Sequence, residues 1–498
     1  MGVYLINSLF LVYEKRVSWV IPMGETKRVK VALVSPPPPS PLAFVDYQNP
    51  LIGLAYLAAV LEKNGHEVMV VDCPAFHMTY RDLEQEIRRF KPDIVGITSV
   101  TATFTSALKV ARAIKEAYPQ TLIVFGGPHV TIIDEQIIMK HREVDVVVKG
   151  EGEQTIVDLA RCVSGVMSLN EVAGITFRKN GQVVHTPPRP CIENLDELPH
   201  PAYHYFPLSK YRIFGKLGLP MITSRGCASQ CTFCLVPQIA GNHFRARTPA
   251  NVVDEMEWLR DRYHPDFFTF NDEVFTYDKK RVLEICSEIR RRKVRLPWDC
   301  QTRVDLVSPE LLYKMRMANC QLVSFGVESG SQEILNAMKK GTTVEQNETA
   351  IKWVKEAGLS VTVSLIIGYP GETKETLKQT IDFIKKTEPD DIYLFLATPY
   401  PTTEVRDTVV DMGWKMSQDW NDYEMQTPTF QNMVVSFDKI NNIREIFYNQ
   451  LYSPSYILRQ SLKGTIYSRI MVQNGLHQLL WRLKLPWLSA NFKKLLHM

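Results

Sequence analysis

Short apolar, β-branched runs alternate with amphipathic segments along the first third of the chain. The runs predict buried strands, and the segments between them predict helices because their apolar residues recur at helical spacing. This alternation is typical of an α/β domain with a parallel, doubly wound, Rossmann-like sheet. The predicted strands are residues 29–35, 67–72, 94–99, 121–125 and 144–149, and the predicted helices include 51–64, 80–90 and 105–117.

A second alternation of strands and helices fills residues 211–410. Six βα units predict a partial, open TIM-like barrel, whose chemistry belongs at the carboxyl ends of its strands. The predicted strands are 221–224, 267–271, 298–302, 322–326, 361–367 and 391–396, and the helices lie near 249–263, 278–292, 309–318, 343–357 and 373–387.

Residues 161–210 have the composition of a linker between these two patterns. The runs 172–177 and 182–186 flank Asn180-Gly181, a pair that predicts a β-hairpin turn, and a proline-rich stretch follows. The remaining parts are an N-terminal extension, 1–27, in which Met1 and Met23 are both candidate starts, and a mostly helical C-terminal region, 411–498.

Composition indicates a soluble globular protein of the cytoplasm. Of the 498 residues, 45% are hydrophobic and 22% are charged, and no run reaches the roughly 18–20 apolar residues that a membrane-spanning helix requires. Three of the nine cysteines fall in one loop and the others are scattered, which does not favour a disulfide framework.

The three clustered cysteines are Cys227, Cys231 and Cys234, with the spacing Cys-x3-Cys-x2-Cys. A compact loop of this kind can bind three irons of one 4Fe–4S cluster, and the fourth iron then has no protein ligand. The alternative is a zinc knuckle with His243 as fourth ligand, although the paired spacings usual for zinc are missing.

This loop resembles that of the radical S-adenosylmethionine (SAM) superfamily, in which SAM chelates the open iron. The resemblance extends to one motif at each later strand end, and each motif alone is weak. It implies SAM contacts from Phe233 (adenine), Asp272 or Glu273 (amino group), Arg303 (carboxylate), Glu328 and Ser329 (ribose or carboxylate) and Gly368 (adenine). For two acidic residues a purely structural role is the alternative. Glu328 would then be a buried acid paired with Arg303, and Glu372 would only interact with a helix dipole.

Residues 28–160 resemble the cobalamin-binding domain that precedes many radical SAM cores. The matching phrases are Pro50-Leu-Ile-Gly-Leu-Ala-Tyr-Leu-Ala58, Gly126-Gly-Pro-His129 and Gly150-Glu-Gly-Glu153. The resemblance implies cobalamin contacts from Ser99, Thr101, Gly126, Gly127, His129, Gly150 and Glu151. The loop 35–49 lacks the cobalt-binding histidine of the wider family, so a histidine-off cobalamin is expected. The alternative is a flavodoxin-like domain without a ligand.

Together these resemblances imply a cobalamin-dependent radical SAM C-methyltransferase. Such an enzyme takes electrons from a donor such as flavodoxin or ferredoxin, cleaves SAM to a 5′-deoxyadenosyl radical and methylates an unactivated carbon. The alternatives are an anaerobic ring-forming cyclase of the same layout and a non-catalytic cobalamin or redox sensor. Methylthiotransferases and nucleic-acid partners are not favoured, because no second cysteine trio and no nucleic-acid domain are present.

The tail 453–498 has seven Lys or Arg residues and no acidic residue. Leu476, Leu479, Leu480 and Leu483 recur at helical spacing beside Trp481 and Trp487, which is typical of a helix that lies on an anionic membrane surface. This interpretation predicts membrane association at the cytoplasmic face and a lipid or isoprenoid-type substrate. The alternative is a helix docked on the barrel with its basic face in solvent.

Overall fold

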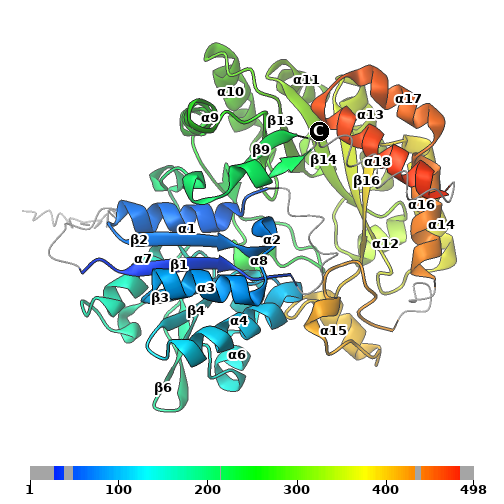
Figure 1. The fold of residues 1–498 in the computed structure, drawn as a ribbon. Coiled ribbons are helices and arrows are strands. Elements are labelled where there is room, and N and C mark those ends of the chain that lie inside the picture. Colours follow the sequence, from blue (N-terminus) through cyan, green and yellow to red (C-terminus); the bar gives the residue numbers. More distant parts are fainter. Residues whose placement is uncertain (1–26, 39–48, 214, 432–438, 483–498) are drawn as a thin grey trace, which may run out of the picture.

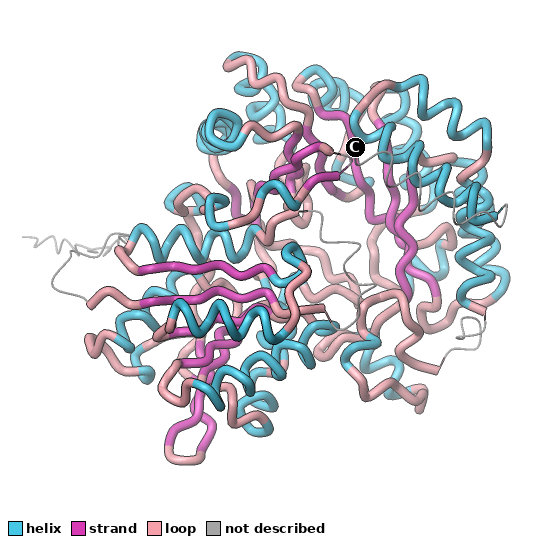
Figure 2. The backbone as a smooth tube through the Cα atoms, in the orientation of Figure 1, coloured by secondary structure: helices cyan, strands magenta, loops and turns pink. Residues whose placement is uncertain are grey.

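Two seven-stranded sheets form the framework of the protein, and helices cover the outside of each (Figures 1 and 2). The computed structural model describes residues 27–38, 49–213, 215–431 and 439–482. The α/β architecture expected from the apolar pattern is confirmed in both halves of the chain.

The first sheet has the strand order β2-β1-β3-β4-β5-β6-β7. Its first five strands are parallel, and β6 and β7 are antiparallel additions at one edge. The strands are β1 (Lys30–Ser35), β2 (Glu67–Asp72), β3 (Ile94–Thr98), β4 (Leu122–Gly126), β5 (Val146–Val148), β6 (Ile175–Lys179) and β7 (Gln182–His185).

Helices cover both faces of this sheet because successive strand residues point to opposite sides. Val31 and Leu33 of β1 belong to the same apolar cluster as α1 and α7, whereas Ala32 and Val34 belong to the cluster that includes α3, α4 and α6. The helices are α1 (Ile52–Lys63), α2 (Cys73–Phe76), α3 (Tyr80–Phe90), α4 (Phe104–Ala117), α5 (Pro128–Ile132), α6 (Asp134–Lys140) and α7 (Glu153–Val163).

The hairpin expected around Asn180-Gly181 is present as β6 and β7. Both turn residues have positive φ, 52° and 81°, as a tight hairpin turn requires. Strand β6 pairs with β5, so the hairpin extends the first sheet and does not lie in a separate linker.

The second sheet has the order β16-β15-β14-β13-β12-β9-β8, and all neighbouring pairs are parallel except β8 with β9. Its end strands β8 and β16 do not pair with each other in the described chain, so the barrel is partial and open. The strands are β8 (Arg212–Ile213), β9 (Lys216–Met221), β12 (Phe267–Phe270), β13 (Trp298–Thr302), β14 (Cys320–Glu328), β15 (Ser360–Ile367) and β16 (Asp391–Leu396).

Helices line the outside of this partial barrel and continue into the C-terminal region (Figure 1). The short α8 (Val236–Ile239) lies in the cysteine loop. The others are α9 (Pro249–Tyr263), α10 (Lys279–Arg291), α11 (Pro309–Met317), α12 (Gln332–Ala337), α13 (Val344–Glu356), α14 (Lys374–Thr387), α15 (Glu404–Asp411), α16 (Ile440–Leu451), α17 (Pro454–Lys463) and α18 (Ile466–Arg482).

The first barrel strand is β9, not the predicted run 221–224, which was wrong. Gly218 and Pro220 weaken the strand pattern of β9, but the glycine is needed because a Cβ there would lie 2.4 Å from the Phe267 ring. Ser224 and Arg225 instead form β10, which pairs with β11 (Arg245–Ala246) in a separate two-stranded ribbon. The cysteine loop therefore joins the two strands of this ribbon.

One apolar core runs through both halves of the molecule. Leu54 of α1 and Ile156 of α7 belong to the same buried cluster as Tyr203 and as Met256 of α9. Polar contacts cross the same boundary, since the Tyr211 hydroxyl donates to Asp72 at 2.5 Å. Burying each such apolar side chain contributes about 1.5–3 kcal/mol, so the two sheets are firmly packed together.

The C-terminal helices dock on the partial barrel through tyrosine hydroxyls. Tyr467 of α18 donates to Asp299 of β13 at 2.5 Å, and Tyr456 of α17 donates to the Asp390 carbonyl at 2.5 Å. Residues 466–482 are thus a docked helix, as the alternative interpretation of the tail predicts. Leu483 and Trp487, on which the membrane interpretation also rests, lie outside the described residues. No described helix is long and apolar enough to cross a membrane.

Candidate functional site

The three cysteines lie in the loop between β10 and β11 and line one cavity of about 300 Å³. Cys227 is buried, Cys231 and Cys234 are half-buried, and all three are free thiols. Gly226 has φ 86°, and a Cβ there would lie 2.1 Å from the His243 carbonyl. Only glycine therefore allows the two ends of the loop to approach so closely.

Four of the residues implied by the radical SAM resemblance line the same cavity: Phe233, Glu273, Arg303 and Glu328. They come from the cysteine loop and from the carboxyl ends of β12, β13 and β14, where barrel chemistry is expected. Phe233 packs against an apolar cluster that includes Tyr369, which holds its ring at the cavity wall. Gln301, Ser324 and Ser364 also line the cavity. Gln301 lies near the end of β13, whereas Ser324 and Ser364 lie within β14 and β15, where no motif pointed to them.

Lys340 is a cavity residue that the sequence did not single out. Its Nζ lies 2.7 Å from Glu328 Oε1, and both side chains are less than 10% exposed. Glu328 is therefore paired with Lys340 and not with Arg303, which binds Asp305 and the Lys340 carbonyl at 3.0 Å. Gly326 makes room for the pair, because a Cβ there would lie 2.6 Å from Glu328 Oε1.

Three of the implied SAM contacts point elsewhere. Asp272 is fully buried and accepts hydrogen bonds from Thr223 and Ser224, so its carboxylate holds the segment that leads into β10. Ser329 is also fully buried and contacts Thr380 at 3.1 Å. Gly368 donates its N–H to Glu372, and neither Gly368 nor Ser329 is among the residues around the cysteine cavity. Of the two acids considered for the SAM amino group, the geometry favours Glu273.

The three thiols of the cysteine loop line one cavity, as ligands of separate irons in one cluster would. His243, the fourth ligand of the zinc alternative, is bonded to Glu193 at 3.1 Å and does not line the cavity. Burial raises the pKa of Cys234 to about 11 and also raises that of Cys231, while the nearby charge of Lys340 opposes both shifts.

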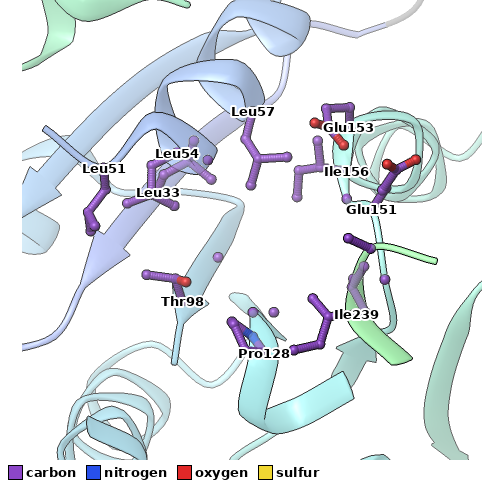
Figure 3. A pocket seen from close by; sticks show the side chains of 18 of the residues that line it. Leu33, Leu51, Leu54, Leu57, Thr98, Pro128, Glu151, Glu153, Ile156 and Ile239 are labelled. Atoms are coloured by element: carbon purple, nitrogen blue, oxygen red, sulfur yellow. The ribbon is translucent and has the colours of Figure 1, made fainter. Parts of the chain in front are cut away.

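A second cavity, of about 330 Å³, opens at the carboxyl ends of the strands of the first sheet (Figure 3). Its walls are mostly aliphatic, with Leu33, Leu54, Leu57 and Ile156 among the residues labelled in Figure 3. Gly126, Gly127, Gly150 and Glu151 line it, as the cobalamin resemblance implies. Gly127 has φ 101°, and a Cβ there would lie 2.8 Å from the Ser99 carbonyl. A bulky, largely apolar ligand fits these walls.

Ser99, Thr101 and His129 are not among the residues around this second cavity, so their expected cobalamin contacts are not supported. His129 is fully buried, its Nδ1 lies 3.1 Å from Thr101 Oγ1, and its ring packs 4.6 Å from Phe104. Burial lowers the pKa of His129 to about 4, so the ring is neutral and acts as a core residue. The residue follows β4, as expected, but its ring lies against Phe104 of α4 and Trp420 and not at the cavity.

Glu273 joins the two cavities, because it lines both of them. Burial raises the pKa of its carboxyl, whereas the Gly226 N–H and the Arg225 charge lower it. A third cavity, of about 240 Å³, continues into the barrel interior and shares Gln301 and Ser324 with the cysteine cavity. The two candidate cofactor sites are therefore neighbours, with the barrel interior below them.

Two family models match the chain: the B12 binding domain over residues 42–160 and the Radical SAM superfamily over residues 221–384. The chain is 34% identical over 427 residues to an uncharacterised methyltransferase of Pyrococcus horikoshii, covering 86% of this chain and 93% of that protein. It is 32% identical over 419 residues to the anaerobic magnesium-protoporphyrin IX monomethyl ester cyclase of Rubrivivax gelatinosus, covering 80% of this chain and 74% of that protein.

The fold is also that of a solved enzyme of this kind. The radical SAM methyltransferase TsrM from Kitasatospora setae superposes with a TM-score of 0.67 at 19% identity, covering 86% of this chain and 90% of that one. The order of the two domains, the cysteine loop and the two adjoining cavities all agree with these matches. The chain therefore belongs to the cobalamin-binding radical SAM enzymes, the family of cobalamin-dependent methyltransferases and their cyclase relatives, whose cofactors are a 4Fe–4S cluster, SAM and cobalamin.

Proposed function

We propose that this enzyme methylates an unactivated carbon of a lipid or isoprenoid-type substrate. The observation that carries the reaction type is the shared wall between the cysteine cavity and the glycine-lined cavity, where Glu273 lines both. When bound, the cluster and SAM supply radical chemistry from reductive cleavage, and cobalamin supplies the methyl group.

The residues of the chain bind and orient these groups. Cys227, Cys231 and Cys234 would ligate the cluster, and the carboxylate of Glu273 is placed to accept hydrogen bonds from an ammonium group. Arg303 lines the same cavity while two of its guanidinium nitrogens bond Asp305 and the Lys340 carbonyl, and its positive charge suits the carboxylate of SAM. The half-buried ring of Phe233 provides an apolar surface for the adenine and helps to exclude water.

The lipid-type substrate is supported by the C-terminal region. Leu458 and Leu462 lie one helical turn apart on α17 and are 64% and 80% exposed, while the neighbouring Arg459 and Lys463 are paired with Glu388 and Asp390. Exposed leucines that share one helix face are typical of a helix that meets lipid. Contact with a membrane at the cytoplasmic face, and electrons from a flavodoxin or ferredoxin, complete this proposal.

Anaerobic reconstitution with methyl-labelled SAM, cobalamin, a reductant and a lipid extract tests the reaction type. Label in an extracted product together with 5′-deoxyadenosine supports methylation. 5′-Deoxyadenosine without label transfer would favour the ring-forming alternative, which the match to the cyclase of Rubrivivax gelatinosus keeps relevant. No 5′-deoxyadenosine from an enzyme with an intact cluster would favour a sensor, and Cys231→Ala serves as the cluster-free control.

Flotation with anionic vesicles tests the membrane contact separately. Because α17 and α18 are docked through buried tyrosines, the informative variants are Leu458→Ser/Leu462→Ser and removal of residues 483–498. Met139→Ser, which changes an apolar side chain that is 65% exposed on α6, is the matched control. Equal flotation of all four proteins would argue against a membrane surface at this end of the molecule.

A further inference from the structure

Four buried charged side chains join the glycine-lined cavity to the base of the cysteine loop. Arg225 Nη2 lies 2.6 Å from Glu153 Oε1, and Arg225 Nη1 lies 3.1 Å from Glu151 Oε1. Arg245 Nη1 lies 2.8 Å from the same Glu151 oxygen. None of the four side chains is more than 10% exposed, and their formal charges cancel.

The two acids and the two arginines come from the two different domains. Glu151 and Glu153 lie on either side of Gly152, where α7 begins, and all three line the glycine-lined cavity. Arg225 ends β10 directly before the cysteine loop, and Arg245 begins β11 directly after it. These two arginines are also register partners in the β10–β11 ribbon, so they form the base of the cysteine loop.

Further contacts hold three members of this cluster, Glu151, Arg245 and Arg225, in place. Glu151 Oε2 accepts the Ile192 N–H at 2.6 Å, and Arg245 donates to the Ile192 carbonyl at 2.7 Å and to the Ala240 carbonyl at 2.5 Å. The guanidinium of Arg225 lies over the ring of Tyr56 in α1, 5.6 Å from its centre. The cluster therefore joins the cobalamin domain, the connector and both ends of the cysteine loop.

Stability alone does not account for such an arrangement. Taking four ions out of water carries a large desolvation penalty, and well-packed apolar side chains of similar volume are often as stable or more stable. Ion pairs of arginine do restrict geometry, because the planar guanidinium has fixed donor directions and so allows few relative positions of the two groups that it joins. A cluster of this kind fixes geometry between segments.

We propose that Arg225 is a positioning residue that, through Glu151 and Glu153, fixes the cysteine loop relative to the cobalamin cavity and so sets the distance between the two cofactors. Glu151 was expected as a cobalamin contact from its motif. Its carboxylate oxygens are instead used by Arg225, Arg245 and Ile192, so its principal role is in this cluster. This role of Arg225 does not depend on the substrate.

Pulsed electron paramagnetic resonance on the reconstituted enzyme measures this distance without turnover, between cob(II)alamin and the reduced cluster. One informative variant is Arg225→Lys, which keeps the positive charge but loses the two guanidinium nitrogens that reach Glu151 and Glu153 separately. The other is Arg225→Gln/Glu153→Gln, which replaces both charged side chains of this pair with neutral ones. Arg292→Gln, which removes an arginine from an ion-pair group at the surface, is the control. We expect a broadened distance distribution and cobalamin affinity weakened about tenfold in both informative variants, the equivalent of one charge-assisted hydrogen bond, with iron content unchanged.

An unchanged distance distribution and cobalamin affinity in the double variant would overturn the proposal, even if its melting temperature fell, because the cluster would then serve stability alone. If Arg225→Lys does not fold, the double variant decides, since it leaves no unpaired buried charge from this pair. Hydrogen exchange of the cofactor-free protein gives a second readout: faster exchange in residues 150–153 and 226–244 is expected, and wild-type rates there would contradict the positioning role.

Discussion

Replacing Lys340 with methionine removes the positive partner of Glu328 and keeps an apolar chain of similar length. At 2.7 Å and an effective dielectric constant of about 20, the attraction between the two charges is about 6 kcal/mol, most of which offsets the desolvation of the two ions. Removing one partner leaves a buried carboxylate without a counter-charge, so we expect Lys340→Met to lower the free energy of unfolding by about 3–5 kcal/mol. That is a large part of a typical folding stability.

Urea unfolding of the cofactor-free protein measures this change in the free energy of unfolding. The double variant Lys340→Met/Glu328→Gln tests whether the unpaired carboxylate of Glu328 causes it. Because the double variant buries no unpaired charge, it should recover most of the lost stability. The double variant removes the Lys340 charge, which lowers the pKa of the Cys231 thiol, and also the smaller effect of Glu328, which raises it. The thiol should therefore form its thiolate less readily, and the iron content after reconstitution should fall below that of the wild type. A loss below about 1 kcal/mol in the single variant, within the range of exposed ion pairs, would refute the reasoning.

Three further outcomes are expected. Burial raises the pKa of Asp299 to about 7, so the folded chain holds the carboxyl proton more tightly than the unfolded chain does. The protonated carboxyl therefore stabilises the fold at low pH, and up to about 4 kcal/mol of this stability is lost as the pH rises from about 4 to about 7. Asp299→Asn should therefore melt higher than the wild type at about pH 8 but not at about pH 4, and parallel melting curves would contradict this. Gly127→Ala places a Cβ 2.8 Å from the Ser99 carbonyl at positive φ, so the wall of the cobalamin cavity must shift. Equilibrium dialysis should then show cobalamin binding weakened at least tenfold, and an unchanged affinity would mean that cobalamin binds elsewhere. Cys227→Ala should abolish both the cluster and SAM cleavage, measured as iron content and 5′-deoxyadenosine, and retained cleavage would overturn the cluster assignment.

The sheets and the cysteine loop could be predicted because they depend on local patterns. Most strands of both sheets are buried on both faces, so they appear in the sequence as continuous apolar runs and not as an alternation of apolar and polar residues. The ends of β2 and α3 are those predicted. Strand β9 was missed because its glycine serves a contact with Phe267, a residue distant in sequence. The hairpin was recognised from its turn, but its pairing with β5 is a long-range choice that the turn does not encode.

The site could be predicted only to the level of the loops that form it. Asp272 and Glu273 are adjacent at one strand end, and only the packed structure shows that the first points to Thr223 and the second to the cavities. His129 has a core position for the same reason, since its burial against Phe104 depends on how α4 packs. Lys340 follows α12, away from any strand end, so no motif pointed to it.

The common apolar core of the two sheets limits how freely the domains of this enzyme can be exchanged. Residues of α1 and α7 face Tyr203 and α9 across the boundary, so a cobalamin domain taken alone would expose leucine and isoleucine side chains that are now buried. A chimaera that takes its cobalamin domain from a relative would therefore have to bring matching surfaces on α9 and on the connector.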